Sequence, residues 1–467
     1  MKLGEKAISR VGEVFRRADL GDARLVRRAV GLAQALAEAP DLSLPQVWAT
    51  AAELQAGYDF LRSPRTDFTD LMEPVQQFTR EQALEERRVL MLHDTTDMVC
   101  ASAEAEEVGV LSTGKAGFYV HHTLCVSAKD RRPLGVIWSQ LWGRASRSVR
   151  GQKMTSAQLA KLDERESDRW FEGVTEAQLW AEGCEDVVHV MDREADSFRL
   201  FQHMQALGAD FVVRLRNERA LAEGQQLSEV LSDAPVRLKR VVALSSKAAK
   251  SIPRVMYKGR AAREAQLTVR CAPVALKVPD FLGKKTAPVE VNVVQVLEEQ
   301  PPEGCAPIAW VLATTLPIDT KAHIERVIDI YRTRWMIEEF HKALKTGCMF
   351  EKRKLESFNS VTTLLAFCYP VACELLRVRS RARQAGIPAH DVFRSSLLDC
   401  LRAHPKARQF SDNPTAQEVL EVIAALGGHQ KHNGPPGWET LAAGYMKLLE
   451  FERGWLAALA SRETINR

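Results

Sequence analysis

The chain has 467 residues, of which 46% are hydrophobic and 27% charged, enough apolar residues for packed cores in about two to four domains. The mean hydropathy is -0.21 and no run of about 18 apolar residues occurs, which argues against a membrane span. The N-terminal segment lacks the apolar core of a secretory signal, and the nine cysteines are scattered without a CxxC pair. This pattern argues against a disulfide framework or a zinc site and fits a reducing cytoplasm.

The formal net charge of +4 is less informative than its distribution. Residues 236–286 hold thirteen Lys or Arg but only two acids, Glu264 and Asp280, a balance of +11. Such a block suits a polyanion such as a phosphate backbone. A solvated loop or a basic sheet face explains the same pattern, and the sequence leaves both interpretations open.

The first part of the chain is predicted to form a helical domain over residues 1–80. Gly21 and Asp22 interrupt its first helical pattern, and Asp22 can cap the helix that follows. The helical patterns cover residues 8–39, 48–61 and 68–86.

A mixed α/β core is predicted next, with its first part over residues 81–224. Short apolar runs indicate five strands, at residues 88–93, 118–127, 134–142, 187–191 and 210–215. Two helices are predicted among them, at residues 156–181 and 194–206.

The second half of the chain is predicted to contain a β-rich basic insertion and then helices. The insertion covers residues 225–317, with strands at 268–275, 289–297 and 308–314. A long helix over 320–346 follows, with Asp319 as its N-cap and Gly347 as its stop. Residues 318–384 complete the core, with a kink at Pro370, and residues 385–467 form a helical C-terminal domain for dimerisation.

Two aspartates stand where acids can bind a cation. Asp94 and Asp192 each directly follow an apolar strand. Acids at the ends of adjacent strands face the crevice where open α/β sheets bind ligands, and two of them can share a hard divalent cation. Taken singly, each is as well explained as a turn or cap residue.

One stripe of the long helix is polar in an unusual way. Its members are offset by 0, 3, 7, 11 and 14 positions: Tyr331, Arg334, Glu338, Lys342 and Lys345. This set suits a surface that holds a metal and grips phosphate oxygens, although a solvated face with an Arg334–Glu338 pair explains it too. Glu339, the rival acid, points about 100° away from the stripe.

These motifs together carry a family resemblance. DTT at Asp94, DREAD from Asp192, and the Y-x2-R-x3-E-x6-K spacing from Tyr331 resemble DDE transposases of bacterial insertion sequences, in the group that contains the Tn-five transposase. ESDRW at 166–170 and the N-terminal helices resemble further segments of that group. The resemblance covers about residues 20–461 and is weakest in the basic insertion and in 385–425.

The resemblance implies a fold and an activity. The fold would be α/β, an RNase H-like mixed sheet with a β-rich insertion, flanked by helical domains. The enzyme would bind double-stranded DNA, both element ends and target, as a homodimer in the synaptic complex, without a membrane. Its acids would hold two Mg²⁺, for which Mn²⁺ can substitute, to nick the DNA, form and reopen a hairpin, and join 3′ ends to target. A cytoplasmic, nucleoid-associated location is expected.

The same resemblance assigns individual residues. Asp94, Asp192 and Glu338 match the catalytic, metal-binding triad. The residues that match DNA contacts are Tyr331, Arg334, Lys345, Lys342, Arg214, Trp310, Lys354 and Glu356. Trp310 matches an aromatic platform for a flipped base, and its other explanation is a core aromatic on a strand.

Two departures from the family pattern stand out. Asp97 follows DTT where an apolar residue or Ser is more usual, and Pro370 falls within an apolar helix. Neither removes a member of the triad.

Two other functions remain open. A domesticated DNA-binding protein could keep this fold without transposing, although an intact triad argues against it. A glycosidase would use two acids and no metal, but the basic block and the cationic stripe argue against a neutral sugar.

Overall fold

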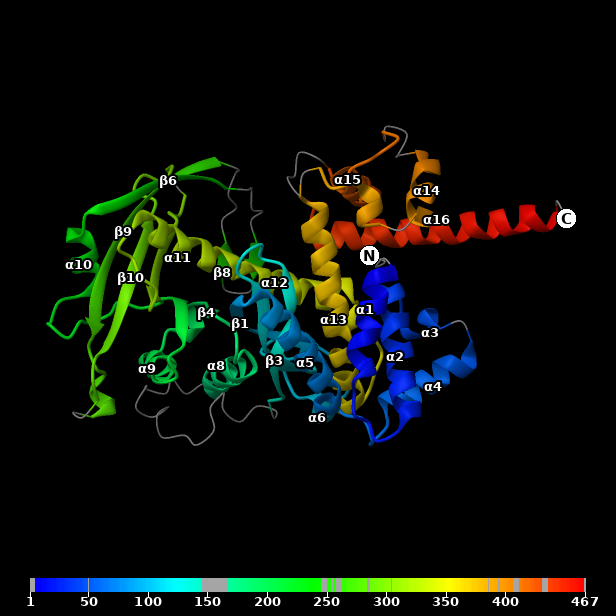
Figure 1. Cartoon of the computed structure of the whole chain (residues 1–467), viewed down its shortest axis with the longest axis horizontal. Helices are drawn as coiled ribbons and strands as arrows, with labels where there is room; N and C mark the ends of the chain where they lie inside the picture. The colour runs from blue at the N-terminus through cyan, green and yellow to red at the C-terminus, as the bar shows by residue number, and fades with distance from the viewer. Residues whose placement is uncertain are drawn as a thin grey trace.

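The structure is a computed structural model in which central strands are covered by helices on both sides (Figure 1). It describes residues 5–48, 50–144, 167–244, 250–252, 255–257, 263–283, 286–303, 305–384, 386–393, 395–405, 411–430 and 436–465.

The N-terminal helices begin and end at well-defined caps. They are α1 (Glu5–Arg16), α2 (Ala23–Glu38), α3 (Leu44–Val47), α4 (Ala51–Leu61) and α5 (Phe68–Glu86). The predicted cap is confirmed, because the Asp22 side chain accepts a hydrogen bond from the backbone N–H of Arg24. Helix α4 begins at Ala51 rather than at 48, because Thr50 and Glu53 form a capping box that fixes its first turn.

The core sheet has the strand order and directions of an RNase H-like fold. Its strands are β1 (Arg88–Val99), β2 (Gly117–Ser127), β3 (Pro133–Trp142), β4 (Asp186–Met191) and β5 (Asp210–Arg214). They lie in the order β3-β2-β1-β4-β5. The first three form an antiparallel meander, and β4 and β5 run parallel to β1. The mixed α/β prediction is confirmed.

Strand β1 is longer than predicted. It was expected to end at residue 93, but its antiparallel pairing with β2 continues to Val99 opposite Gly117. The parallel pairing with β4 stops at Leu92 opposite Val190. Asp94 therefore lies inside β1, whereas Asp192 directly follows β4 as predicted.

The β-rich segment extends the core sheet. Strand β11 pairs antiparallel with β5, and the sheet continues through β10 and β9 to β6. The bounds are β6 (Val236–Leu244), β9 (Arg263–Leu276), β10 (Val289–Leu297) and β11 (Ala309–Thr314), with β7 (Lys250–Ile252) and β8 (Val255–Tyr257) as a separate hairpin. Short elements connect these strands: α6 (Ala105–Val108), α10 (Leu227–Asp233) and η2 (Asp280–Leu282).

Helices cover both faces of the sheet, because side chains alternate along each strand. Val89 and Met91 of β1 face α8 (Asp168–Trp180), whose neighbour α9 (Phe198–Ala206) follows the short turn η1 (Arg193–Ala195). Leu90 and Leu92 belong to the core on the other face, with α11 (Lys321–Thr333), α12 (Trp335–Lys342) and α13 (Phe358–Ala382). The second half of the helix predicted over 156–181 corresponds to α8, while residues 145–166 lie outside the described residues.

The predicted long helix is interrupted. Arg334 ends α11 and begins α12, and a π-helical turn, η3 (Ala343–Gly347), follows α12 and stops at the predicted Gly347. The predicted N-cap Asp319 is wrong, because the Thr320 side chain accepts the capping hydrogen bond from the N–H of His323. A π turn adds a residue to one turn, so Lys345 no longer keeps its helical phase with Glu338.

Helix α13 joins the N-terminal helices to the core sheet. The Phe367 ring lies 4.5 Å from that of Phe15 and 5.8 Å from that of Phe60. Such pairs contribute about 0.5–1.5 kcal/mol each beyond the burial of their area. By length and composition α13 could cross a membrane, and 83% of its most apolar window is buried within the protein. The helix continues through Pro370.

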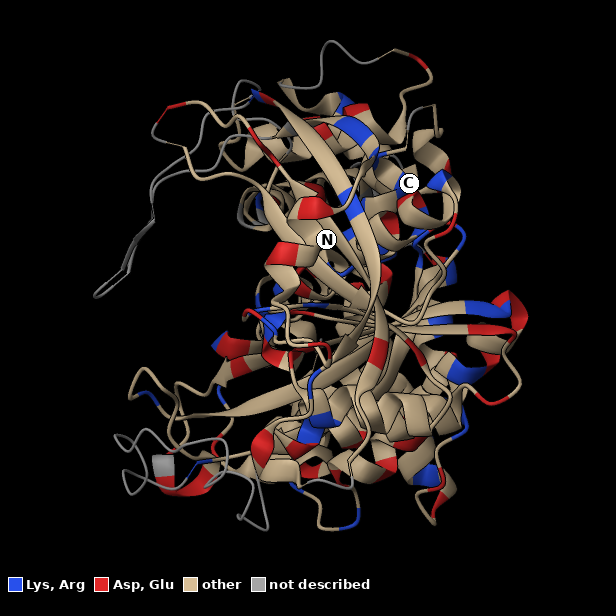
Figure 2. Ribbon diagram, turned by 90° about the vertical axis from the view of Figure 1, so that its left-hand side faces the viewer, with Lys and Arg blue, Asp and Glu red and all other residues tan. Residues whose placement is uncertain are grey.

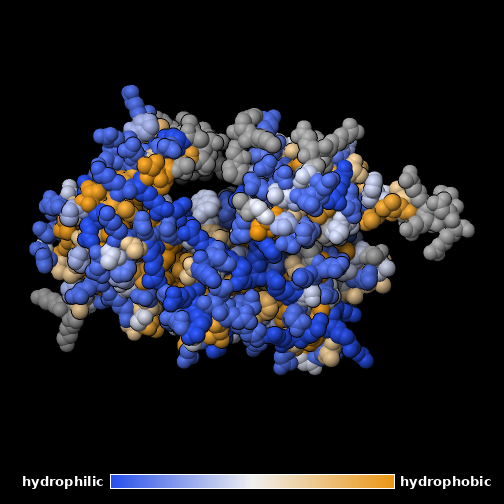
Figure 3. All heavy atoms as spheres, turned by 45° about the horizontal axis from the view of Figure 1, so that its top comes forward, coloured by the Kyte–Doolittle hydropathy of each residue, from blue (hydrophilic) through white to orange (hydrophobic). Residues whose placement is uncertain are grey.

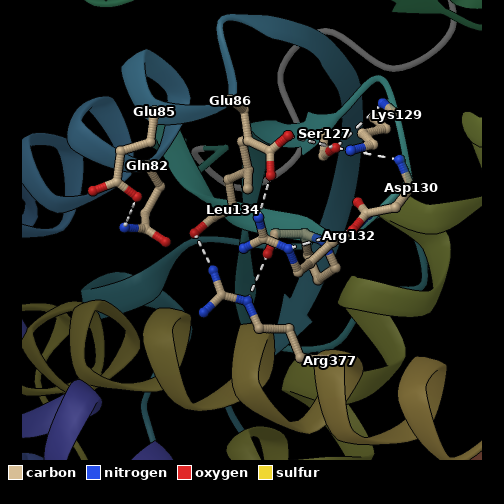
Figure 4. A network of polar contacts seen from close by, with 10 residues as sticks. Gln82, Glu85, Glu86, Ser127, Lys129, Asp130, Arg132, Leu134 and Arg377 are labelled. Atoms are coloured by element: carbon tan, nitrogen blue, oxygen red, sulfur yellow. Dashed lines mark hydrogen bonds and ion pairs between the residues drawn. The ribbon is translucent and has the colours of Figure 1, made fainter.

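The edge of the sheet where β3 begins is tied to α13 by hydrogen bonds. Arg377 donates to the carbonyl oxygens of Pro133 at 2.7 Å and Leu134 at 2.8 Å, and Arg132 pairs with Glu86 beside them (Figure 4). Arg377 also pairs with the buried Glu374 at 2.6 Å.

The C-terminal segment ends in a long helix that extends away from the other elements (Figure 1). The elements are η5 (Ala389–Asp391), α14 (Ser395–Ala403), α15 (Ala416–Leu426) and α16 (Trp438–Ile465), after the turn η4 (Phe350–Lys352). Helices α15 and α16 cross closely at two glycines. A Cβ atom at Gly427 would lie 1.8 Å from the Thr440 carbonyl oxygen, and one at Gly444 would lie 1.7 Å from that of Ile423.

Candidate active site

Three carboxylates from distant parts of the chain lie near one another, and two of them contact Arg334. Asp94 is in β1, Asp192 follows β4, and Glu338 is in the first turn of α12. Asp94 and Asp192 lie two residues beyond the last paired positions, Leu92 and Val190, so the parallel register places them side by side.

The electrostatic interactions of Asp94 with Asp192 and Glu338 show that these two acids lie near it. Burial raises its pKa to about 7, and the charges of Asp192 and Glu338 add to the rise. Arg334 and the N–H of Thr95, which donates to Asp94 Oδ1 at 2.8 Å, act in the opposite direction. A buried carboxylate with a raised pKa beside two other acids is typical of a site built for a cation.

Arg334 bridges two of the acids. Its Nη2 donates to Glu338 Oε1 at 2.6 Å, and its Nη1 lies 3.8 Å from Asp94 Oδ2. Because Arg334 and Glu338 are four residues apart on one helical path, the guanidinium turns toward the same side as the carboxylate. The predicted i,i+4 pair is thus present, and it faces the sheet rather than solvent.

The two adjacent glutamates of α12 point in different directions, as their helical spacing predicts. The carboxylate of Glu339 accepts from Trp438 Nε1 at 2.9 Å and from Trp335 Nε1 at 3.3 Å, and it pairs with the buried Arg379. These partners belong to α12, α13 and α16. Glu338 faces Asp94, whereas Glu339 ties α12 to the C-terminal helices.

Three of the predicted DNA contacts form a cluster beside the acids. The Trp310 ring lies 5.2 Å from that of Tyr331 at 69°, and Arg214 Nη2 donates to the Ala309 carbonyl at 2.8 Å. Burial raises the pKa of Tyr331, while the nearby Arg334 and Arg214 act to lower it. Trp310 is only partly buried and packs against the edge of the core, so the explanation as a core aromatic accounts for it only in part.

Lys345 is held by acids from outside its helix. Its Nζ lies 2.7 Å from Asp97 Oδ1 and 3.7 Å from Glu351 Oε1. Glu351 in turn accepts from the N–H of Val99 at 3.1 Å. Asp97, the departure from the family pattern, therefore pairs with the lysine that the same pattern assigns to DNA.

The remaining predicted contacts lie apart from the carboxylates. Lys342 Nζ is 3.0 Å from Glu339 Oε1 and 5.0 Å from the centre of the Trp335 ring, on the side of Glu339. Lys354 and Glu356 are exposed on the segment between η4 and α13.

A group of buried histidines lies directly behind the acids, and sequence reasoning missed it. On one face of the sheet, His93 Nε2 hydrogen bonds with His189 Nδ1 at 2.9 Å. On the other, His122 lies opposite Asp94 in β2 and hydrogen bonds with His341 at 3.2 Å and the Tyr369 hydroxyl at 3.0 Å. Burial lowers the pKa of all four, so they are neutral hydrogen-bonding groups. Three of them lie within three residues of a triad acid in the sequence, which was a usable signal: His93 directly before Asp94, His189 before Asp192 and His341 after Glu338.

The basic stretch 236–286 is partly neutralised by acids from beyond its ends. Arg263 pairs with Glu298, Arg270 with Glu299 at 2.8 Å, and Arg240 with Asp329 at 3.2 Å. The balance of +11 counted only acids within the stretch, so it overstates the net positive charge around these strands in the folded protein. Seven of its cations lie outside the described side chains: Lys247, Lys250, Arg254, Lys258, Arg260, Lys284 and Lys285. Elsewhere positive and negative residues are interspersed (Figure 2).

The chemistry of this donor set fits a divalent cation. Carboxylate oxygens are the ligands that Mg²⁺ prefers, and a cation would relieve the repulsion that raises the Asp94 pKa. Within the described ranges, no three His, Cys, Asp or Glu side chains converge closely enough to hold one ion. Because Arg334 stands between Asp94 and Glu338, coordination by all three acids requires its guanidinium to move.

Comparisons with known proteins identify the class. A family model described as transposase DNA-binding matches residues 11–66, and one described as transposase DDE domain matches residues 174–371. The second match contains Asp192 and Glu338, and Asp94 lies before it. The chain is also similar to a cryo-EM structure of the piggyBac transposase synaptic complex with hairpin DNA, with a TM-score of 0.37 and 10% identity over 81% of this chain and 74% of that one. That likeness is too weak to support an argument.

The two matches define a DNA-binding transposase. Its catalytic part is a DDE domain with an RNase H-like sheet, and its partner is DNA. DDE domains of this class cleave and join DNA and use divalent metals.

Proposed function

We propose that the chain is a cut-and-paste transposase of the Tn-five type, encoded by a bacterial insertion sequence. The observation that carries the proposal is the proximity of Asp94 to Asp192 and Glu338, with Arg334 between Asp94 and Glu338, in a fold and with matches of the DDE class. The Y-x2-R-x3-E-x6-K spacing from Tyr331 supports the particular group.

The three carboxylates would hold two divalent ions, Mg²⁺ or in its place Mn²⁺. When bound, such ions activate a nucleophile and stabilise the leaving oxygen of a phosphodiester. Glu338 would have to exchange its hydrogen bond with Arg334 for the cation, which frees the guanidinium to grip a phosphate in a bidentate manner.

The neighbouring residues would bind the DNA around the cleavage point. Tyr331 and Arg214 lie beside the acids and would contact the DNA backbone there. Lys345 can exchange its ion pair with Asp97 for one with a phosphate. Trp310, which is only partly buried, offers a surface for an unstacked base, which suits an intermediate with a hairpin end. Cleavage would then proceed by a nick, hairpin formation and reopening, and joining of the 3′ ends to target DNA.

Two copies of the chain would hold the two element ends. The support is the distal part of α16, which extends away from the fold and exposes apolar side chains such as Leu456 and Leu459. We place the working enzyme on the nucleoid in the cytoplasm, without a membrane.

The test is cleavage of a linear duplex that carries the terminal sequence of the encoding element. With Mg²⁺ the protein should give nicks and then hairpins, and Asp192→Asn should remove both while its gel-shift affinity stays within about twofold. Binding without cleavage by the unmodified protein would indicate a domesticated DNA-binding protein. Cleavage that persists in EDTA would contradict a metal-dependent site.

A further inference from the structure

The carboxylates of Asp94 and Asp192 are each fixed by the backbone of a residue that follows them. The N–H of Thr95 donates to Asp94 Oδ1 at 2.8 Å, and the N–H of Glu194 donates to Asp192 Oδ1 at 2.8 Å. Each acid is therefore oriented by its own segment, Thr95 in β1 and Glu194 in η1.

The backbone pairing between these two segments ends before the acids. Strands β1 and β4 pair in parallel only as far as Leu92 and Val190, two residues short of Asp94 and Asp192. The distance between the two carboxylates thus depends on contacts other than the hydrogen bonds of the sheet.

One arginine outside the triad contacts both segments. Arg169, in the first turn of α8, donates from Nε to Thr95 Oγ1 at 2.9 Å, and its Nη2 lies 3.5 Å from Glu194 Oε2. These are the same two residues whose amides cap Asp94 and Asp192. A planar guanidinium can serve both partners from a fixed geometry, which a lysine ammonium cannot do equally well.

The guanidinium of Arg169 is itself firmly placed. It lies 5.2 Å from the centre of the Trp142 ring and 5.8 Å from that of Trp170, and the side chain is 12% exposed. Cation–π contacts of this kind hold a guanidinium in place where it is partly desolvated. Thr95 is held from its other side by His121 Nδ1 at 2.9 Å.

We propose that Arg169 is a positioning residue that sets the separation of Asp94 and Asp192 by linking Thr95 to Glu194. It acts through these two residues and touches neither carboxylate nor DNA in the proposal. The inference rests on the proposed function, because the separation matters only if the two aspartates share a cation.

Removing the link should weaken metal binding while DNA binding is retained. Loss of a partner that orients metal ligands typically costs about 10- to 100-fold in metal affinity or activity. We expect Arg169→Lys and Arg169→Gln to raise the Mn²⁺ dissociation constant, followed by electron paramagnetic resonance without DNA, by about tenfold or more. The Mn²⁺ concentration for half-maximal nicking should rise in parallel, and the gel-shift affinity for the element-end duplex should stay within about twofold.

Arg377→Lys is the matched control. Arg377 is 10% exposed, pairs with one glutamate and donates to two backbone carbonyls, but it lies at the end of the sheet where β3 begins, away from the acids (Figure 4). It should lower the melting temperature at least as much as Arg169→Lys and leave the Mn²⁺ dissociation constant unchanged. An effect on metal binding that matches that of Arg169→Lys would reduce Arg169 to a stabilising residue and overturn the proposal.

Two milder variants test the link if Arg169 variants do not fold. Thr95→Val and Glu194→Gln each remove one end of the link and keep the size of the side chain. Each should raise the Mn²⁺ dissociation constant about threefold or more, and unchanged values in both would overturn the proposal. If the unmodified protein shows no metal-dependent nicking, the proposed function fails. If it nicks normally and the Arg169 variants bind Mn²⁺ as it does, only this inference fails.

Discussion

Asp94 is the residue whose ionisation the fold opposes most clearly at the site. Its pKa of about 7 lies well above the ordinary 3.8, with burial as the main cause and the charges of Asp192 and Glu338 as further causes. Between pH 3.8 and about pH 7, Asp94 of the metal-free protein therefore keeps its proton in the folded state. In the unfolded state the same carboxyl has already lost its proton in this range. Stability falls as the pH rises through that window, and the full cost is present above pH 7.

Asp94→Asn should remove this cost. In EDTA at pH 8 we expect the variant to have a free energy of unfolding about 2–4 kcal/mol higher than that of the unmodified protein, less whatever the lost attraction to Arg334 contributes. At pH 4 the difference should nearly vanish, because Asp94 is then protonated in the folded state. Urea unfolding at the two pH values measures this, and an equal effect at both would contradict the electrostatic explanation.

At this scale the sequence indicated the direction of a side chain better than its contacts. Helical spacing alone selected Glu338 over Glu339, and the structure places their carboxylates on different sides of α12. The pairing of Lys345 with Asp97 could not be predicted, because it joins residues 248 positions apart through the packing of α12 and η3 on β1. The partners of the buried histidines could not be predicted for the same reason, because their positions in the sequence place them near the acids but do not reveal which residue each one contacts.

At the scale of elements, α12 has two different tasks on its two sides. Glu338 faces the sheet, where it forms part of the proposed metal site, whereas Glu339 binds Arg379 of α13 and Trp438 of α16. The same Glu→Gln substitution at these two adjacent positions therefore separates an effect on catalysis from an effect on stability.

Glu339→Gln should lower stability, and Glu338→Gln should remove catalysis. Without the Glu339 carboxylate, the buried Arg379 loses its counter-charge, which costs about 3 kcal/mol. We expect a lower melting temperature for Glu339→Gln, with residual nicking at low temperature. Glu338→Gln should melt close to the unmodified protein and show no nicking. Thermal melts and a nicking assay on both proteins test this. The prediction is contradicted if Glu338→Gln lowers the melting temperature and retains nicking while Glu339→Gln melts normally and does not nick.

Element boundaries were predictable where local chemistry determines them. The predicted bounds of 68–86 match α5, and Asp22 caps α2, because these ends depend on side chains within a few residues. The end of β1 was wrong because a hairpin partner, not a local pattern, extends it to Val99. The break at Arg334 and the π turn after Lys342 depend on how the helix packs between sheet and C-terminal helices, which periodicity does not reveal.

At the scale of the whole molecule, the sheet is continuous from β3 to β6, so the β-rich segment extends the catalytic sheet. The sequence indicated the strands of this segment, but not that they continue the catalytic sheet. That arrangement depends on the pairing of β11 with β5, which are far apart in the sequence. The N-terminal and C-terminal helices both pack on α13 within one hydrophobic cluster. DNA bound by the N-terminal helices, which match the transposase DNA-binding model, would therefore be held by the same core that positions Glu338.

The distal part of α16 is an exposed apolar surface in the described part of the chain. It extends beyond the other helices (Figure 1), and apolar residues lie on this projection (Figure 3). Leu456 and Leu459 are 47% and 43% exposed, and Phe451, which contacts the His404 ring, is 36% exposed. Apolar side chains grouped on an extended helix mark an interaction surface. If two copies pair through it, each supplies one RNase H-like site, as synapsis of two element ends requires.

Replacing both Leu456 and Leu459 with Glu should prevent this pairing, because four buried carboxylates in a paired interface would repel one another without compensation. We expect a monomer by light scattering, a gel shift of single element ends within about twofold of normal, and loss of the complex that contains two ends, with hairpin formation reduced at least tenfold. Leu84→Glu with Leu207→Glu is the control, since those leucines are similarly exposed, at 37% and 38%, on α5 and at the end of α9. Paired-end complexes that survive the α16 substitutions would place the dimer contact elsewhere, and loss of single-end binding would mean that α16 supports the fold of one chain.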